Sequence, residues 1–293
     1  MKTVLILGSS GQIGSHLTHY LNLKKKYKIL KFDLANSKYE DLRINNNKKL
    51  KKLVKKSDFI FFLAFDVGGS VYLKKYQNSY NFLNNNISIM KNTFQAIYQH
   101  QKKFVFASSQ MSNMNFSTYG VLKRIGEDMT KSIGGISLRF WNVYGVEKNL
   151  EKSHVITDFL LKGLKNRKIN MLTDGNEKRD FLYAEDCCRG LEIIMNKFDK
   201  LKNNTSIDLN YGFYTKIIDV AKVIKKLFKN YNINVRIIKG IQTDDVQRNK
   251  INVSNNLLNK FWKPQYSLEK GIEKILLYYL SHEKNKYFKY FNV

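Results

Sequence analysis

Short apolar runs alternate with longer amphipathic stretches along the first half of the chain. The apolar runs predict β-strands at residues 3–7, 28–32, 59–64, 103–106 and 135–140. Apolar positions at helical spacing predict helices between them, at 12–23, 79–100 and 119–133. Continuous apolar runs are typical of strands buried on both faces, and strands that alternate with helices form parallel sheets. The pattern predicts an α/β fold built on a doubly wound parallel sheet.

The alternation loosens after about residue 141, and the rest of the chain predicts a different unit. Helical stretches fall near 154–166, 185–196, 215–229 and 268–281, with short strands between them. We therefore expect a first domain over residues 1–146, with a return segment near 178–210. A smaller mixed α/β lobe is expected mainly over residues 147–293.

The two cysteines and the shortness of the apolar runs limit the class of protein. Cys187 and Cys188 are adjacent, which excludes a disulfide framework and a structural zinc site and indicates a reducing compartment. The longest apolar stretch, 59–65, is far below the roughly 20 residues of a membrane span. The N-terminal apolar run stops at Gly8, too early for a signal peptide. We expect a cytoplasmic protein with no metal site and no membrane partner.

The strong positive charge is open to two interpretations. The formal net charge is +27, from 51 basic and 24 acidic residues, as expected of a nucleic-acid binder. However, the basic residues are overwhelmingly lysines, and they are spread from Lys24 to Lys289. Net charge governs solubility and non-specific binding more than fold. We interpret the lysines as solvated and expect no specific nucleic-acid partner, with a selected polyanion surface as the alternative.

A glycine-rich loop follows the first predicted strand and opens the first predicted helix. Its sequence, Gly8-Ser9-Ser10-Gly11-Gln12-Ile13-Gly14, has the pattern G-x-x-G-x-x-G. Glycines there let the backbone turn tightly and approach a pyrophosphate, whose charge is met by the helix N-terminus. The motif predicts a Rossmann domain that binds a dinucleotide. The residues assigned to the cofactor are Gly8, Ser10, Gly11, Gln12, Ile13 and Gly14.

An acidic residue ends the second predicted strand. Asp33 lies about 20 residues after the glycine loop, where a carboxylate accepts both hydroxyls of the adenosine ribose. A negative charge at that point repels a 2′-phosphate, so NAD is expected rather than NADP. The alternative is that Asp33 only closes a turn at the strand end.

A tyrosine and a lysine four positions apart supply a candidate general base. The spacing of Tyr119 and Lys123 carries no weight alone, because it recurs at Tyr20/Lys24, Tyr27/Lys31, Tyr98/Lys102 and Tyr266/Lys270. Only Tyr119 starts a helix shortly after a strand that ends in Ala107-Ser108-Ser109. The i, i+4 spacing places phenol and ammonium on one helical face. The lysine is expected to lower the pKa of Tyr119 from about 10 toward neutrality.

With these motifs in this order, the chain resembles the extended short-chain dehydrogenases/reductases of the nucleotide-sugar epimerase/dehydratase type. The resemblance runs nearly end to end. Its motifs are the glycine loop, Asp33, Asp41-Leu42, Leu63-Ala64-Phe65, Asn86, Ser109, Tyr119, Lys123, Asn142 within 139–145, Arg179-Asp180-Phe181 and Trp262-Lys263-Pro264. The resemblance implies an NAD cofactor and a nucleotide-sugar substrate. It also implies a homodimer formed through the helices near 79–100 and 119–133.

The resemblance implies a role for each matching residue. Tyr119 is the expected base that takes a sugar hydroxyl proton while hydride leaves the same carbon for NAD. Lys123 is expected to hold the nicotinamide ribose, and Ser109 to hydrogen-bond the reacting oxygen. Arg179 is expected on the pyrophosphate of the sugar nucleotide. The other cofactor residues are Asp41, Leu42, Leu63, Ala64 and Phe65, and the other substrate residues are Asn86, Asn142 and Arg248.

Departures from the family pattern narrow the reaction. Dehydratases of this type carry Thr-Asp-Glu where this chain has Ser109-Gln110-Met111, and related 3,5-epimerases have a cysteine in place of Met111. What remains is hydride exchange at sugar C4, ending in release of a 4-keto sugar or in 4-epimerisation. The Gly68-Gly69 loop resembles that of GDP-mannose 3,5-epimerases and favours a GDP-linked sugar, most specifically a GDP-manno-heptose oxidised in capsule-type biosynthesis. A dinucleotide-sensing or polyanion-binding protein on the same fold is the non-catalytic alternative.

Overall fold

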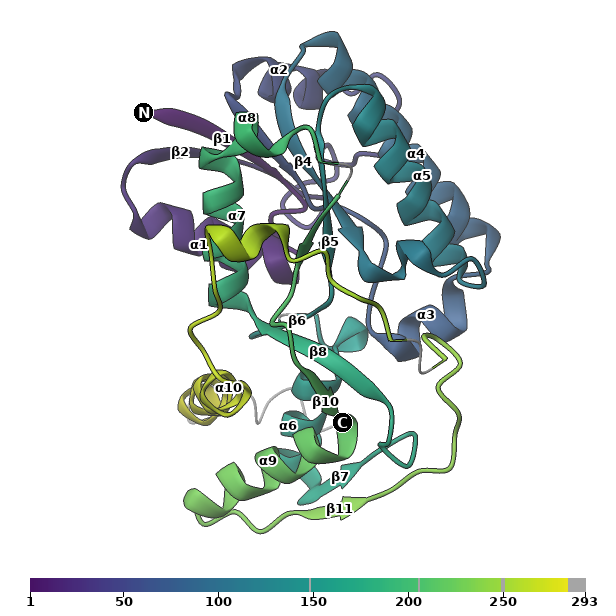
Figure 1. The fold of residues 1–293 in the computed structure, drawn as a ribbon, viewed down its shortest axis with the longest axis vertical. Helices are drawn as coiled ribbons and strands as arrows, with labels where there is room; N and C mark the ends of the chain where they lie inside the picture. The colour runs from purple at the N-terminus through teal and green to yellow at the C-terminus, as the bar shows by residue number, and fades with distance from the viewer. Residues whose placement is uncertain (148, 205, 249–250, 284–293) are drawn as a thin grey trace.

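The central layer of the computed structural model is a parallel sheet (Figure 1). The structure describes residues 1–147, 149–204, 206–248 and 251–283. The sheet has six strands in the order β2-β1-β3-β4-β5-β9. They are β1 (Lys2–Leu7), β2 (Tyr27–Phe32), β3 (Phe59–Phe62), β4 (Lys103–Ser109), β5 (Ile136–Phe140) and β9 (Ile207–Leu209). The chain runs outward from β1 to β2 and returns to β3 on the other side of β1. Open α/β sheets bind their ligands at such a switch point.

Helices cover both faces of this sheet, as the continuous apolar strands require. On one face lie α1 (Gln12–Leu23), α7 (Ala184–Asn196) and α8 (Phe198–Leu201). On the other face lie α2 (Lys48–Lys56), α4 (Tyr80–Gln99) and α5 (Thr118–Ser132). In β1, Val4 and Ile6 join the first apolar cluster, whereas Leu5 and Leu7 join the second. Because successive strand residues point to opposite faces, one apolar run fills both cores. The predicted doubly wound α/β fold is confirmed.

Some elements differ from the prediction. The helices α2 and α3 (Ser70–Tyr76) were not predicted. Six of the nine residues of α2 are lysines and only Leu50 and Val54 are buried, so its apolar stripe is too thin to stand out in the sequence. β4 includes Ala107, Ser108 and Ser109, the residues expected at its end, in addition to the predicted apolar run 103–106, and these three residues line the cavity described below. Short 3-10 helices lie at η1 (Gln110–Asn113), η2 (Leu150–Lys152) and η3 (Leu257–Lys260).

A smaller lobe lies below the main sheet in Figure 1. Its strand β8 (Lys178–Tyr183) pairs in parallel with β6 (Asn142–Tyr144) and antiparallel with β10 (Tyr214–Lys216). A second pair joins β7 (Lys168–Asn170) to β11 (Arg236–Ile238). The helices of the lobe are α6 (Val155–Asn166), α9 (Ile217–Asn230) and α10 (Leu268–Glu283), which share a third apolar cluster. Within residues 178–210, α7 and β9 return to the main sheet, and the boundary near residue 146 stays a prediction.

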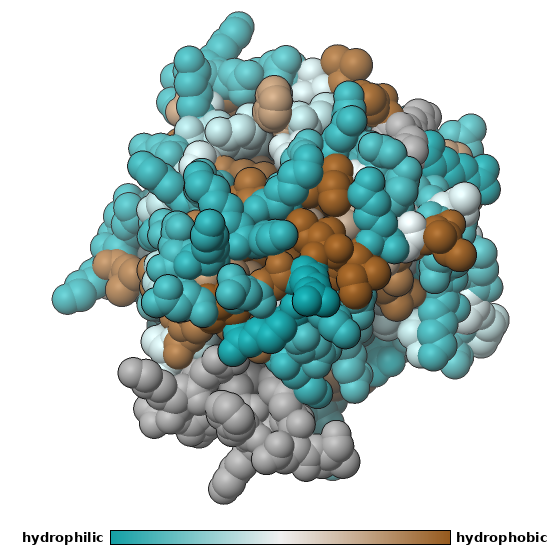
Figure 2. All heavy atoms as spheres, turned by 90° about the horizontal axis from the view of Figure 1, so that it is seen from below, coloured by the Kyte–Doolittle hydropathy of each residue, from teal (hydrophilic) through white to brown (hydrophobic). Residues whose placement is uncertain are grey.

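Both cysteine side chains lie inside the protein, away from the surface. Cys187 and Cys188 are unpaired and buried in the core, where burial raises the pKa of both thiols. No helix among the described residues is long and apolar enough to cross a membrane. In the same residues, no group of three or more His, Cys, Asp or Glu side chains could hold a metal ion. Seen from below, the surface is largely hydrophilic around a central group of hydrophobic side chains (Figure 2).

Candidate active site

A cavity of about 1590 Å³ opens at the carboxyl ends of the central strands. Pockets for one small ligand usually measure about 300 to 1000 Å³, so this cavity has room for a dinucleotide and a second ligand. Residues that follow β1, β2, β3 and β4 line it, facing the loop after β6. The predicted residues in its lining are Gly8, Ser10, Gly11, Gln12, Ile13, Gly14, Asp33, Asp41, Leu42, Leu63, Ala64, Phe65, Ser109, Tyr119, Lys123 and Asn142.

The loop between β1 and α1 has room only for glycine at two positions. Gly8 has a φ of +85°, and a Cβ there would lie 2.7 Å from the backbone nitrogen of Ala64. A Cβ on Gly14 would overlap the carbonyl oxygen of Gly8. α1 begins at Gln12, and no side chain caps its first turn. The uncapped N–H groups are available to an anion, so the loop fits the pyrophosphate of a dinucleotide.

Carboxylates surround the place expected for the adenosine ribose. Asp33 accepts a hydrogen bond of 2.8 Å from the backbone N–H of Ser10. Glu40 accepts one of 2.9 Å from the backbone N–H of Asp33. Nearby, Arg43 lies 2.7 Å from Asp41 in an ion pair, which occupies the guanidinium. Glu40 is paired with Lys49 at 2.6 Å, so it is the carboxylate of Asp33 that makes this end unfavourable for a 2′-phosphate and favours NAD.

Ser109 and Tyr119 meet where β4 ends and α5 begins. Ser117 caps α5, and Gly120 has no room for a side chain because the carbonyl oxygen of Met111 lies against it. This close packing brings Tyr119 to Ser109. Burial raises the pKa of Tyr119 to about 12, although a hydrogen bond with Ser109 lowers it. The sequence prediction that Lys123 lowers this pKa toward neutrality is not met here, because desolvation of the phenol dominates.

The ammonium group of Lys123 is enclosed beside this pair. Its Nζ donates to the carbonyl oxygen of Ala107 at 2.6 Å and lies 3.5 Å from the ring centroid of Phe65. Desolvation lowers the pKa of Lys123 well below its usual value, and the carboxylate of Glu127 raises it. Glu127 in turn accepts hydrogen bonds from Arg139 at 2.7 Å on both of its oxygens. The structure therefore brings together the three residues predicted to be catalytic.

Besides the catalytic residues, four residues were predicted to bind the substrate. The structure brings one of these four to the cavity. Asn142 lines it and donates to the carbonyl oxygen of Asp180 at 3.3 Å. Asn86 is fully buried, and its side-chain amide makes two hydrogen bonds with the backbone of Asp66. It therefore supports the cavity wall and does not line the cavity. Arg179 is buried in an ion pair, and Arg248 lies over the ring of Phe116, 4.3 Å from its centroid. Neither arginine lines the cavity.

A polar cluster in the cavity wall was not among the predicted site residues. The Asp66 carboxylate accepts from the hydroxyl of Tyr72 at 2.6 Å and pairs with Lys152 at 2.9 Å. The backbone N–H of Gly69 donates to the carbonyl oxygen of Lys152 at 3.1 Å. A side chain on Gly69 would strike the carbonyl oxygen of Ser153. The Gly68-Gly69 loop thus lets a distant segment cross it, which no local pattern could reveal.

Glu147 and His154 form a second polar pair in the wall that the predicted site did not contain. Nδ1 of His154 lies 2.6 Å from Oε1 of Glu147, and the backbone N–H of His154 donates to Oε2 at 2.9 Å. Both residues line the cavity. Glu147 is almost fully buried, and no motif around it in the sequence predicts that its carboxylate lines a cavity.

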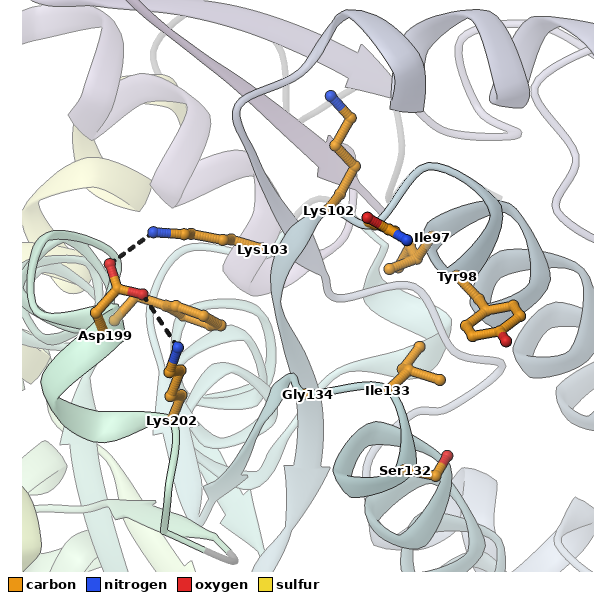
Figure 3. Close-up of a pocket in the computed structure, with 11 residues that line it drawn as sticks. Ile97, Tyr98, Lys102, Lys103, Ser132, Ile133, Gly134, Asp199 and Lys202 are labelled. Atoms are coloured by element: carbon orange, nitrogen blue, oxygen red, sulfur yellow. Dashed lines mark hydrogen bonds and ion pairs between the residues drawn. The ribbon is translucent and has the colours of Figure 1, made fainter.

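A smaller cavity of about 400 Å³ lies at the other end of β4. Figure 3 shows Asp199 between two lysines, at 2.6 Å from Lys103 and 3.6 Å from Lys202. No predicted catalytic or cofactor residue lines it. The carboxylate of Asp199 is paired with two surface lysines. Because the predicted catalytic and cofactor residues line the larger cavity, that cavity is the candidate active site.

The chain is similar to proteins whose names describe enzymes that act on nucleotide sugars. The model of the NAD dependent epimerase/dehydratase family matches residues 4–210. UDP-glucuronic acid decarboxylase 1 from Danio rerio is 22% identical over 97% of this chain and 75% of its own length. A GDP-6-OMe-4-keto-L-xylo-heptose reductase from C. jejuni has a TM-score of 0.80 at 17% identity, covering 97% of this chain and 98% of that one. The UDP-glucose 4-epimerase of Thermotoga maritima has a TM-score of 0.76 at 19% identity, covering 96% and 99%.

Proposed function

The chain belongs to the NAD-dependent epimerase/dehydratase family, and from that premise we propose that it oxidises C4 of a nucleotide-diphosphate sugar and releases a 4-keto sugar. The meeting of Ser109, Tyr119 and Lys123 beside a glycine loop carries this proposal. The glycine loop, Asp33 and the cavity beside them fit NAD. The remaining volume accommodates the sugar nucleotide.

Each of the three side chains has a separate role in the proposed oxidation. Tyr119 as phenolate takes the proton of the C4 hydroxyl, and Ser109 donates a hydrogen bond to the same oxygen. Bound NAD supplies the acceptor for the hydride that leaves C4, so the carbon becomes a ketone and two electrons are transferred. Lys123, which lies one helical turn after Tyr119 and whose Nζ is held by the carbonyl oxygen of Ala107, is placed to hold the nicotinamide ribose. The buried wall around Tyr119 excludes water from the reacting oxygen.

A GDP-linked sugar is the first substrate to test, and a GDP-manno-heptose the most specific one. Two observations support this choice. The Gly68-Gly69 loop, which resembles that of GDP-mannose 3,5-epimerases, lines the same cavity as Phe65 and Tyr119. The solved structure with a TM-score of 0.80 is, by its name, a reductase of a GDP-linked 4-keto heptose, which is the same carbon in the reverse direction.

The test is the absorbance of reduced nicotinamide when the NAD-loaded protein meets a panel of GDP- and UDP-sugars. We expect a lasting rise with a GDP-linked sugar, and a product with a 4-keto group by mass and NMR. If no sugar in the panel gives either a rise in absorbance or a new product, the enzymatic assignment is overturned. That result would support a non-catalytic protein that senses dinucleotides.

The second candidate is a nucleotide-sugar 4-epimerase, which returns the hydride to the other face of the ketone. The similarity in fold to the UDP-glucose 4-epimerase favours it. In the same experiment an epimerase gives no net rise in absorbance and a new C4 isomer.

We also propose a homodimer through the outer faces of α4 and α5. Ile87, Val121 and Ile125 are exposed on these helices, at 50%, 42% and 46%. Phe82 and Met90, in contrast, are buried in the core and cannot serve an interface. Light scattering should report twice the monomer mass, and Ile125→Asp should give monomers. A monomeric wild-type protein would contradict this assembly.

A further inference from the structure

The arginine expected to bind the substrate diphosphate already has an internal anion. Arg179 in β8 lies 2.7 Å from the carboxylate of Asp244, and the two side chains are only 8% and 11% exposed. Another nitrogen of Arg179 donates to the carbonyl oxygen of Lys178 at 2.8 Å. A buried guanidinium requires such a counter-charge.

This ion pair lies directly behind the wall of the candidate active site. Val246 and Gln247 line the cavity, and the backbone N–H of Gln247 donates to Asp244 at 3.4 Å. The side chain of Gln247 accepts from the amide of Gln110 at 3.0 Å. Gln110 follows Ser109 in the chain, so the segment of Asp244 connects Arg179 to the catalytic end of the cavity.

The segment 243–248 is held by both buried and exposed contacts: Val246 is 4% exposed within the second apolar cluster and Gln247 is 8% exposed, whereas the charged side chains differ in exposure. Asp245 pairs with Lys74 at 2.7 Å, but both side chains are about half exposed, and such surface pairs contribute little. Arg248 has a φ of +51°, a conformation that non-glycine residues adopt at some cost. Of the two ion pairs that join this segment to other described residues, Asp245–Lys74 and Asp244–Arg179, only the second is buried.

We propose that Asp244 occupies the place of the substrate diphosphate, and that a nucleoside diphosphate displaces it from Arg179. Carboxylate and phosphate oxygens fit the same planar guanidinium, so one can replace the other. Displacement also releases the backbone N–H of Gln247, which donates to the carboxylate of Asp244. Asp244 then sets the affinity for the nucleotide by competing with it. This inference rests on the proposed nucleotide-sugar function.

The experiment measures the binding of GDP and UDP to the full-length protein by calorimetry. Asp244→Asn removes the competing charge, and we expect it to tighten nucleotide binding about 5- to 50-fold. Asp245→Asn is the matched control, since it makes the same charge change one residue away, and its affinity should equal that of the wild type. Arg179→Gln should weaken binding and abolish the effect of Asp244→Asn in the double variant.

The outcomes separate this inference from the proposed function. If the wild type and Asp244→Asn bind nucleotide equally, or the variant binds more weakly, the inference fails while the nucleotide site stands. If no protein binds GDP or UDP, both fail. Should Asp244→Asn not fold, hydrogen exchange on the wild type gives the answer: GDP should speed exchange at the amides of Gln247 and Arg248, and unchanged exchange would overturn the inference.

Discussion

At the scale of single residues, the hydroxyl group of Tyr119 is the group on which the proposed reaction depends. Phenylalanine at this position keeps the edge-to-face contact with the ring of Phe65, whose centroid lies 5.8 Å away, but has no proton to exchange. We expect Tyr119→Phe to lower kcat about 10²- to 10⁴-fold and to leave NAD affinity unchanged. Tyr98→Phe is the control, because Tyr98 also stands four residues before a lysine and is 67% exposed. Full turnover by Tyr119→Phe would remove this residue from the mechanism.

Glu147 makes stability depend on pH. Burial alone would raise the pKa of this carboxyl, but hydrogen bonds from His154 hold it below its ordinary value of 4.5. A lowered pKa in the folded state stabilises the fold above pH 4.5, and the contribution is lost as the pH falls through the folded value. Glu147→Gln should lower the free energy of unfolding by about 1 to 3 kcal/mol at pH 7, and by less near pH 3. Urea unfolding at the two pH values measures this, and an equal loss at both would contradict it.

At the scale of elements, the packing of α1 on β1 forms the cofactor loop. A methyl group on Gly14 overlaps the carbonyl oxygen of Gly8, so Gly14→Ala forces α1 away from the strand. We expect this variant to lose at least about tenfold in NAD affinity and about 1 to 3 kcal/mol of stability. Gly11→Ala is the milder comparison, since its Cβ would lie 3.3 Å from the same oxygen. Calorimetry and urea unfolding test both variants, and equal losses would show that the overlap is not the cause.

At the scale of the whole molecule, the net charge of +27 should produce non-specific, salt-sensitive binding to polyanions rather than specific recognition of a nucleic acid. We expect the affinity for a random RNA to fall at least about 100-fold between roughly 50 and 200 mM salt, because each phosphate contact releases counterions. Fluorescence anisotropy across salt concentrations measures this. Tight binding that persists at physiological salt would favour the selected polyanion surface.

Local sequence patterns were sufficient to predict the sheet, the glycine loop and the position of Ser109 near Tyr119. The run Val4 to Leu7 specifies a strand buried on both faces whatever surrounds it. Gly8 and Gly14 specify a turn that only glycine can make, and the loop meets its helix within a few residues. Ser109 and Tyr119 are ten residues apart, so one strand end and one helix start bring them together.

Only the tertiary structure decided which charged groups face the cavity. Lys152 pairs with Asp66 from 86 residues away, and Asp244 pairs with Arg179 from 65 residues away. Such partners depend on how loops of two lobes pack, and periodicity carries no information about them. The pKa of Tyr119 is likewise a property of burial, which raises it to about 12 despite the lysine one turn later. The sequence by itself determined the fold and the residues proposed for the chemistry, whereas desolvation and long-range pairing determined the pKa of these groups and which side chains line the cavity.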